Sequence, residues 1–391
     1  MGFLDKSIRV VVAANFIAVA ARMSLVTFLG IYFVRQAGID VGMVGLAFLA
    51  ESLLRGAVAP MFGALSDRIG RRMLLIAAAL VTAVVLPSFL LVSGPASLFA
   101  WSVAMGLAGA INMPVATALL LDLAPSGRRQ SVLAANYTAM SIAYTLGVSP
   151  AGYVAEQSYV ALAVIASTGY LLVAALYALA FRAPRPVERN EAGMLRESVA
   201  AFRDRSFLLL AALAFVFPLS MGLVVVASPL WGADAGLGEG YIGLVLGGNS
   251  LIVAALAVPL AARIEPLGPF RLLGAAAFVV ACGIACYAVV PEAAAGYLAG
   301  TVVFSFGELV FSSAVPAAVA RLAPAGRRGA YQGGWTLIAS FSMGSALFVS
   351  GLLRDTIGWR GAWLVFASII AAAALLLLVF RREFLERTRE R

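Results

Sequence analysis

Apolar runs of about 20 residues, the length of helix that crosses the core of a bilayer, recur along nearly the whole chain. Of the 391 residues, 62% are hydrophobic and only 12% are charged, and the mean hydropathy is +0.98. A soluble domain does not have this balance, and the runs lack the alternation of membrane β-strands. The sequence therefore predicts an all-α polytopic membrane protein.

We expect twelve transmembrane helices, and the first is too long for a removable signal peptide. Of the 28 lysine and arginine residues, 23 fall in segments that this topology places in the cytoplasm, two (Arg22 and Arg55) fall inside spans, and only Arg35, Arg354 and Arg360 fall in the outer loops. The positive-inside rule then predicts a multi-pass protein of the cytoplasmic membrane with both termini in the cytoplasm. The excess of cytoplasmic lysine and arginine also accounts for the net charge of +9, so this charge does not indicate a nucleic-acid partner. The predicted spans are 8–35, 41–64, 72–93, 96–121, 131–155, 159–182, 206–231, 239–264, 270–291, 293–321, 329–353 and 361–381.

A repeated heptapeptide divides the chain into two halves. Leu123–Arg129 (LAPSGRR) returns as Leu322–Arg328 (LAPAGRR), with six identities in seven at an offset of 199 residues. The one long polar stretch, 183–205, lies between the halves and contains prolines and mixed charges. We therefore predict an internal duplication, with two pseudo-symmetric six-helix bundles (1–182 and 206–391) joined by a cytoplasmic linker (183–205).

A short connection, GALSDRIGRR (63–72), carries four charges between two stretches that are almost free of charge. Its glycines allow a tight turn, and its acid needs a partner among the arginines or at a helix N-terminus. A degraded copy, Glu265–Gly268, keeps an acid and a glycine but no arginine. We predict that the first copy is a latch between helices, formed by Gly63, Asp67, Arg68, Gly70, Arg71 and Arg72.

Two six-helix halves, a cytoplasmic linker and this latch together resemble the major facilitator superfamily. The resemblance covers the whole chain, and the latch matches the family's motif A at essentially every defining position. A full motif A is widespread in the superfamily, and the overall pattern is most similar to the twelve-helix drug/proton antiporter branch. The resemblance implies alternating access, in which two halves rock about a site near the middle of the bilayer.

The resemblance also assigns partners to the latch. It implies that Asp67 faces the end of the eleventh helix and helps to close the cytoplasmic side, while Arg68 or Arg71 meets an acid on the fourth helix. Asp122 fits that acid, and the alternative is a solvated aspartate at the membrane interface.

One motif of the antiporter branch is changed in this chain. The pattern L-x-x-x-R-x-x-Q-G of the fourth helix corresponds to Leu98–Gly106, where Ser102 and Met105 replace the arginine and the glutamine. The proton route of that motif is therefore in doubt, and Arg22 or Arg55 is the candidate for its electrostatic role.

Four charged residues fall near the middle of predicted helices: Arg22, Glu51, Arg55 and Glu308. Each costs about 3 kcal/mol at a helix centre, so each needs a reason. The first three either form a permanent ion-paired network or border a cavity in which Glu51 changes partner or protonation. Glu308 has no cation near the middle of any second-half helix, so it borrows a partner from the first half or sits protonated.

The chain contains no histidine, so proton chemistry near neutral pH falls to carboxylates. We therefore expect Glu51 or Glu308 to accept the proton. The two arginines also permit an anionic substrate group. Scattered polar side chains predict a mostly apolar cavity suited to an amphiphilic solute, although each has helix packing as its alternative role. The expected cavity residues are Arg22, Arg55, Asn15, Asn112, Asn136, Tyr137, Tyr144, Asn249, Gln332 and Trp335.

We expect a secondary active transporter, most simply for proton-coupled efflux of lipophilic or amphiphilic, drug-like compounds. The alternatives are a carrier of an organic anion or lysolipid that uses the two arginines, and a receptor or assembly factor derived from a transporter. No catalytic constellation, phosphate-binding glycine loop or metal cluster is evident, so we expect no enzyme, cofactor or metal. The expected partners are a small-molecule substrate, protons and the lipid bilayer, without nucleic acid, and the expected state is a monomer.

Overall fold

The computed structural model describes residues 5–125, 128–179, 201–324 and 327–389, and every regular element within these ranges is a helix. Ten helices in the described ranges are long and apolar enough to cross a membrane. One of them, α14 (Arg328–Val379), bends at Gly358, where φ is 72°, and so contains the eleventh and twelfth predicted spans. The more polar α5 (Arg129–Gln157) is not among the ten. The all-α polytopic membrane fold predicted from the sequence is confirmed.

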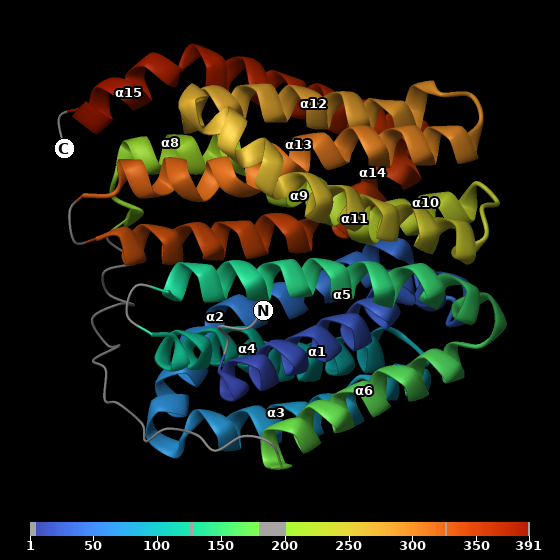
Figure 1. Ribbon diagram of the computed structural model, residues 1–391. Coiled ribbons are helices and arrows are strands. Elements are labelled where there is room, and N and C mark those ends of the chain that lie inside the picture. The colour runs from blue at the N-terminus through green and yellow to red at the C-terminus, as the bar shows by residue number, and fades with distance from the viewer. Residues whose placement is uncertain (1–4, 126–127, 180–200, 325–326, 390–391) are drawn as a thin grey trace. The chain divides into compact units, whose positions relative to one another are not determined.

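The first compact unit comprises Met1–Arg189 and Gly238–Leu251. Figure 1 shows the helices α1 to α6 of this unit. The N-terminal helix α1 contacts α4, α5 and α6, while α2 packs on α4 and α3 packs on α6. The elements are α1 (Lys6–Ile31) continued by the π-helix η1 (Tyr32–Gln36), α2 (Val41–Ile69), α3 (Arg71–Val85) followed by the 3-10 helix η2 (Pro87–Leu91), α4 (Pro95–Leu123), α5, and α6 (Tyr159–Leu179).

Small residues let these helices approach closely, as in other membrane bundles. A Cβ atom on Gly147 of α5 would lie 2.6 Å from the carbonyl oxygen of Ala20 in α1. A Cβ atom on Gly169 of α6 would lie 2.6 Å from Cβ of Ala21. The absence of a side chain at these two glycines therefore sets the spacing of α1 from α5 and α6.

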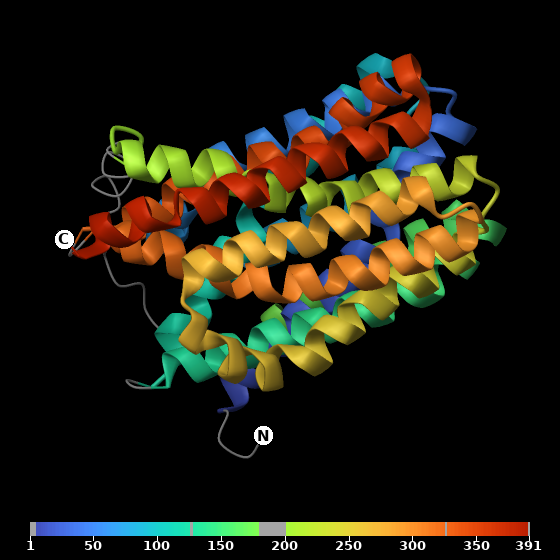
Figure 2. The same cartoon turned by 90° about the horizontal axis from the view of Figure 1, so that it is seen from above.

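The second compact unit comprises Asn190–Leu237 and Ile252–Arg391. Its first spanning segment is interrupted into α8 (Arg205–Ala214), α9 (Val216–Gly222), the π-helix η3 (Leu223–Ala227) and α10 (Ser228–Asp234). The helix α12 packs on both α13 and α14, as Figure 2 also shows. The remaining elements are α11 (Glu239–Ile264), which leaves the first unit after Leu251, η4 (Glu265–Leu267), α12 (Pro269–Val289), α13 (Ala293–Leu322), α14, and α15 (Arg381–Arg389).

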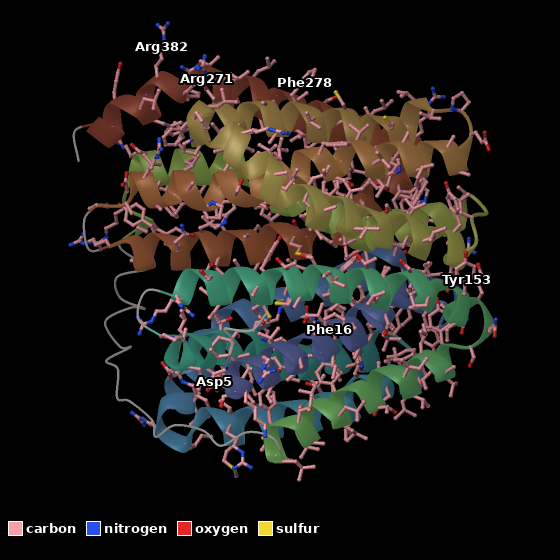
Figure 3. All side chains as sticks on the ribbon, in the orientation of Figure 1. Asp5, Phe16, Tyr153, Arg271, Phe278 and Arg382 are labelled. Atoms are coloured by element: carbon pink, nitrogen blue, oxygen red, sulfur yellow. The ribbon has the colours of Figure 1, made fainter. Side chains whose placement is uncertain are left out.

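Local signals explain several helix ends. Asp5, labelled in Figure 3, accepts the backbone N–H of Lys6 at 2.7 Å, and Asp40 accepts that of Met43 at 3.2 Å, so each caps a helix start. Gly70 after α2 and Gly268 before α12 have φ of 93° and 75°, conformations that favour glycine. The degraded copy of the latch therefore keeps the turn of the first copy although it has lost the arginines.

The predicted division into bundles 1–182 and 206–391 stays a prediction, and most of the predicted linker, 183–200, lies outside the described residues. The structure corrects one detail of the latch. Gly63 lies inside α2, which continues to Ile69, so only Gly70 makes the turn. The hydrogen bond from Ser66 Oγ to the carbonyl oxygen of Gly63, at 2.6 Å, is compatible with this continuous helix.

Candidate functional site

A cluster of three charged side chains joins α1 to α2 in the first unit. Arg22 Nη2 lies 3.0 Å from Glu51 Oε1, and Arg55 Nη2 lies 3.8 Å from Glu51 Oε2. The side chains of Arg22 and Glu51 are 15% and 13% exposed, whereas that of Arg55 is 33% exposed. Because Glu51 and Arg55 are one helical turn apart, α2 presents both on the same face. One carboxylate is thus shared by two guanidinium groups, which leaves the cluster with a net charge of +1.

The helices α4 and α6 complete the surroundings of this cluster. A Cβ atom on Gly109 of α4 would lie 3.1 Å from Arg22 Nη1 and 3.3 Å from Arg55 Cδ, so any side chain there would press on both arginines. Tyr170 of α6 interacts with Arg22 and with Asn112 of α4. Sequence reasoning found the three charges and Asn112 but missed Gly109 and Tyr170, because neither residue type stands out in an apolar helix.

Two other expected cavity residues bond to each other. Asn15 Nδ2 of α1 donates to Asn136 Oδ1 of α5 at 2.9 Å, and Asn136 Nδ2 contacts Met140 Sδ at 3.3 Å. Both asparagines are buried. This arrangement gives the pair a packing role between α1 and α5, which was the alternative role considered for these residues.

The other predicted residues are distributed over both units. In the first unit Tyr137 is exposed, Tyr144 is half-buried and Asn249 is buried. In the second unit Glu308 is half-buried on α13 and Trp335 is buried on α14. Gln332 Nε2 donates to the carbonyl oxygen of Pro316 at 2.8 Å. Within each unit, these side chains add scattered polar groups to largely apolar helices.

The arginines of the latch hold three helices of the first unit together. Arg71 Nη1, at the start of α3, lies 2.6 Å from Asp122 Oδ2, near the end of α4. Arg72 donates from Nε to the carbonyl oxygen of Tyr177 at 2.9 Å and from Nη2 to that of Ala178 at 2.5 Å, so it satisfies terminal carbonyls of α6.

Arg68 is exposed, and the side chain of Asp67 lies outside the part of the chain that the structure describes. The sequence left Arg68 and Arg71 as the two candidate partners of Asp122, and Arg71 is the one that contacts it.

A polar cluster that the sequence did not single out joins α5, α6 and the start of α11. Tyr159 Oη lies 3.0 Å from both carboxylate oxygens of Glu239 and 3.3 Å from the carbonyl oxygen of Phe28. Glu156 Oε1 accepts the backbone N–H of Gly240 at 2.8 Å. All of these residues belong to the first unit, and Arg35 acts electrostatically on Glu239.

A related cluster lies in the second unit. Arg354 Nη2 lies 3.1 Å from Asp234 Oδ2, and Trp359 Nε1 donates to the same oxygen at 2.9 Å. The acid of this cluster, Asp234, is the last residue of α10, so the cluster ties the end of α10 to α14.

Comparisons with known proteins agree with the architecture. The model of the Major Facilitator Superfamily matches residues 11–308 and, in a second match, residues 210–390. A "Na(+), Li(+), K(+)/H(+) antiporter" of Planococcus maritimus is 27% identical over 149 residues, which are 37% of this chain and 34% of that protein. The match thus spans about a third of that relative's length.

Solved transporter structures share the fold at low sequence identity. The nucleoside transporter NupG superposes with a TM-score of 0.76 at 13% identity and covers 96% of this chain and 99% of its own. A bacterial homologue of the human drug peptide transporters gives 0.75 at 15% identity, with coverages of 98% and 99%. A POT family transporter in complex with 5-aminolevulinic acid gives 0.74 at 14%, with 96% of each chain covered. At these identities the likeness shows the fold alone.

Proposed function

We propose, because this chain belongs to the major facilitator superfamily, that it is a proton-coupled antiporter which exports lipophilic or amphiphilic compounds. Family and fold make it a multi-pass membrane transporter of a small molecule. The observation that carries the finer proposal is the half-buried Arg22–Glu51–Arg55 cluster on two spanning helices. Ionisable groups in spanning segments are costly and are usually kept for function.

The geometry of the cluster supplies a way to couple a proton to movement. Glu51 is the counter-charge of both arginines, at 3.0 Å and 3.8 Å. A proton on Glu51 removes both attractions and leaves Arg22 and Arg55 as neighbouring like charges. The contact between α1 and α2 then weakens, so protonation favours a different arrangement of these helices. Glu308, on α13 of the second unit, is the second candidate proton carrier.

The antiporter relative supports the exchange of a transported compound for protons in this chain. Its alkali-metal substrates are not part of our proposal. Its name describes a Na(+), Li(+), K(+)/H(+) antiporter. A cluster with two arginines and one carboxylate repels a small metal cation, because its net charge is positive. The exported compound in our proposal is therefore an organic molecule, held largely by apolar contacts.

Gating at the latch is part of the same proposal. The Arg71–Asp122 pair ties α3 to α4, and Arg72 ties α3 to α6. In this proposal these bonds keep the cytoplasmic ends of the first-unit helices together during half of the transport cycle.

Transport into proteoliposomes tests coupling directly. A panel of lipophilic drugs, lysolipids and organic anions is assayed with and without an imposed pH gradient, for wild type, Glu51→Gln and Glu308→Gln. The matched control is Glu386→Gln, on an exposed position of α15. We expect one of the first two variants to abolish gradient-driven transport and the control to retain it. If the pH dependence of transport is unchanged in both variants, neither Glu51 nor Glu308 is the proton carrier.

Arg55 favours a second candidate function, the carriage of an organic anion. In the described part of the chain its hydrogen bond is to Ser52 Oγ at 3.4 Å, and its distance to Glu51 is 3.8 Å. A guanidinium group has five N–H donors, so several remain for a carboxylate or phosphate. Organic anions that compete for transport in wild type but not in Arg55→Gln would favour this function over drug efflux.

A further inference from the structure

We propose that the second unit contains a binding site for a phosphate-bearing anion, in a pocket beside the start of α8. The pocket has a volume of about 490 Å³, and its lining includes Arg203, Asp204, Arg205, Arg327, Tyr331 and Arg387. Figures 1 and 2 both show the start of α8 and the helix α15 at the same end of this unit. The site does not depend on the transport function proposed above.

The charge of the lining points to an anion. Four arginines and one aspartate give a net charge of +3. Within the described residues, no carboxylate forms an ion pair with Arg203, Arg205 or Arg327, and all three side chains are exposed. Neighbouring cations repel one another, so a bound polyvalent anion would be stabilised here.

Asp204 belongs to the framework of the pocket. Its Oδ1 accepts the backbone N–H groups of Ser206 at 3.0 Å and Phe207 at 3.5 Å, which caps α8. Its Oδ2 accepts the hydroxyl of Tyr331 at 2.6 Å, which ties the start of α8 to α14. The rings of Phe207 and Tyr331 meet at a centroid distance of 5.1 Å. The backbone that carries Arg203 and Arg205 is therefore held in place by Asp204, which lies between them in the sequence.

The helix α15 contributes Arg387 to the lining of the pocket. Phe384 of α15 is buried and stacks on Phe270 of α12 at a centroid distance of 5.4 Å. This contact anchors α15 beside α12, while Arg387, about one turn further on, lines the pocket. An anion held between Arg387 and the arginines at the start of α8 would fasten the last helix to the first spanning segment of the unit.

Phosphate is the anion that this geometry suits. Guanidinium groups bind phosphate oxygens through paired N–H donors, and the lining of the pocket supplies four such groups. The pocket also lies at the ends of spanning helices, where anionic headgroups meet basic side chains. The shared chemistry is a phosphate group, and its source is an anionic phospholipid or a soluble phosphate.

Binding to the purified full chain distinguishes these sources. Phosphatidylglycerol, phosphatidylcholine and inorganic phosphate are titrated in turn, with bound lipid measured by native mass spectrometry and phosphate binding by calorimetry. The test variant combines Arg203→Gln, Arg205→Gln and Arg327→Gln. The control is Arg382→Gln, because Figure 3 shows Arg382 projecting outward from α15, away from the other helices.

We expect the triple variant to lose at least tenfold in affinity for phosphatidylglycerol or for phosphate, and the control to lose less than twofold. Loss for the lipid identifies a headgroup site, and loss for inorganic phosphate alone identifies a soluble ligand. Replacing the same arginines with lysine keeps the charge and checks that the glutamine variant has not simply unfolded. Equal losses in the triple variant and the control, or binding of neither anion by wild type, would overturn the site.

Discussion

Removing the carboxylate shared by Arg22 and Arg55 should destabilise the first unit more than removing a complete ion pair. Glu51→Gln keeps the size of the side chain but leaves two guanidinium groups, 15% and 33% exposed, without their counter-charge. The double variant Glu51→Gln with Arg22→Met removes both the acid and the more deeply buried base. Only the better exposed Arg55 then remains, and it can reach water more easily.

The distances set the size of the effect. At an effective dielectric constant of about 20, unit charges separated by 3.0 Å and 3.8 Å attract by roughly 5.5 and 4.4 kcal/mol. The cost of removing three charges from water offsets most of this attraction, so the intact cluster contributes little net stability. Breaking it by removing one partner costs about 3–5 kcal/mol, because buried charge is left uncompensated. For a unit of about 200 residues this corresponds to a fall in Tm of roughly 6–20 °C.

Thermal unfolding in detergent micelles, monitored by size-exclusion chromatography, measures the difference in stability between the single and the double variant. We expect Glu51→Gln to unfold well below wild type and the double variant to recover at least about 1 kcal/mol of the loss. The control Glu386→Gln should stay within about 0.5 kcal/mol of wild type. A single variant as stable as wild type, or a double variant less stable than the single one, would refute the electrostatic reasoning.

Three further predictions concern contacts within the first unit. Asp122→Asn weakens the 2.6 Å contact with Arg71, so amide hydrogen exchange should become faster at the start of α3 and the end of α4. If exchange there equals that of the exposed control Asp355→Asn, the pair does not tie these two helices together. Gly147→Ala places a Cβ atom 2.6 Å from the carbonyl oxygen of Ala20 and should lower the free energy of unfolding by about 1–3 kcal/mol, measured by thermal unfolding. The control Gly248→Ala, with nothing within 4 Å of the added Cβ atom, should be neutral or stabilising. Equal effects of the two variants would show that Gly147 does not set the spacing of α1 and α5. Tyr159→Phe removes the hydroxyl that lies 3.0 Å from both oxygens of Glu239. It should lower local stability by about 1.5–3 kcal/mol, measured as faster amide hydrogen exchange at the start of α11. No difference from the exposed control Tyr153→Phe would argue against this hydrogen bond.

Local sequence signals predicted the helices well. The thickness of a bilayer fixes the length of an apolar span, so the fold class follows from hydropathy alone. The family also followed from a short charged motif and an internal repeat, both of which are contiguous in the sequence. Gly63 was misplaced at a turn because a glycine near the end of an apolar run reads equally well as the end of a helix or as its interior.

Partners distant in the sequence could be predicted only in part. Helical periodicity placed Glu51 and Arg55 on one face, but it could not give the distances to Arg22. Asn15 and Asn136 were each expected at a cavity, and they bond to each other across 121 positions of sequence. No sequence signal indicated that Tyr159 and Glu239 would meet, since a tyrosine and an acid at the ends of two spans are ordinary interfacial residues.

The sequence by itself determined that this protein is a helical membrane protein of the transporter superfamily, because span length, charge bias and motif are all local properties. The tertiary structure decided which charges meet: Arg71 with Asp122, Glu51 with two arginines, and four arginines around one pocket beside α8. The physical reason is that a charge near or within the bilayer must find its counter-charge through the packing of helices. That packing depends on where glycines let two backbones approach, which the order of residues along one helix does not specify.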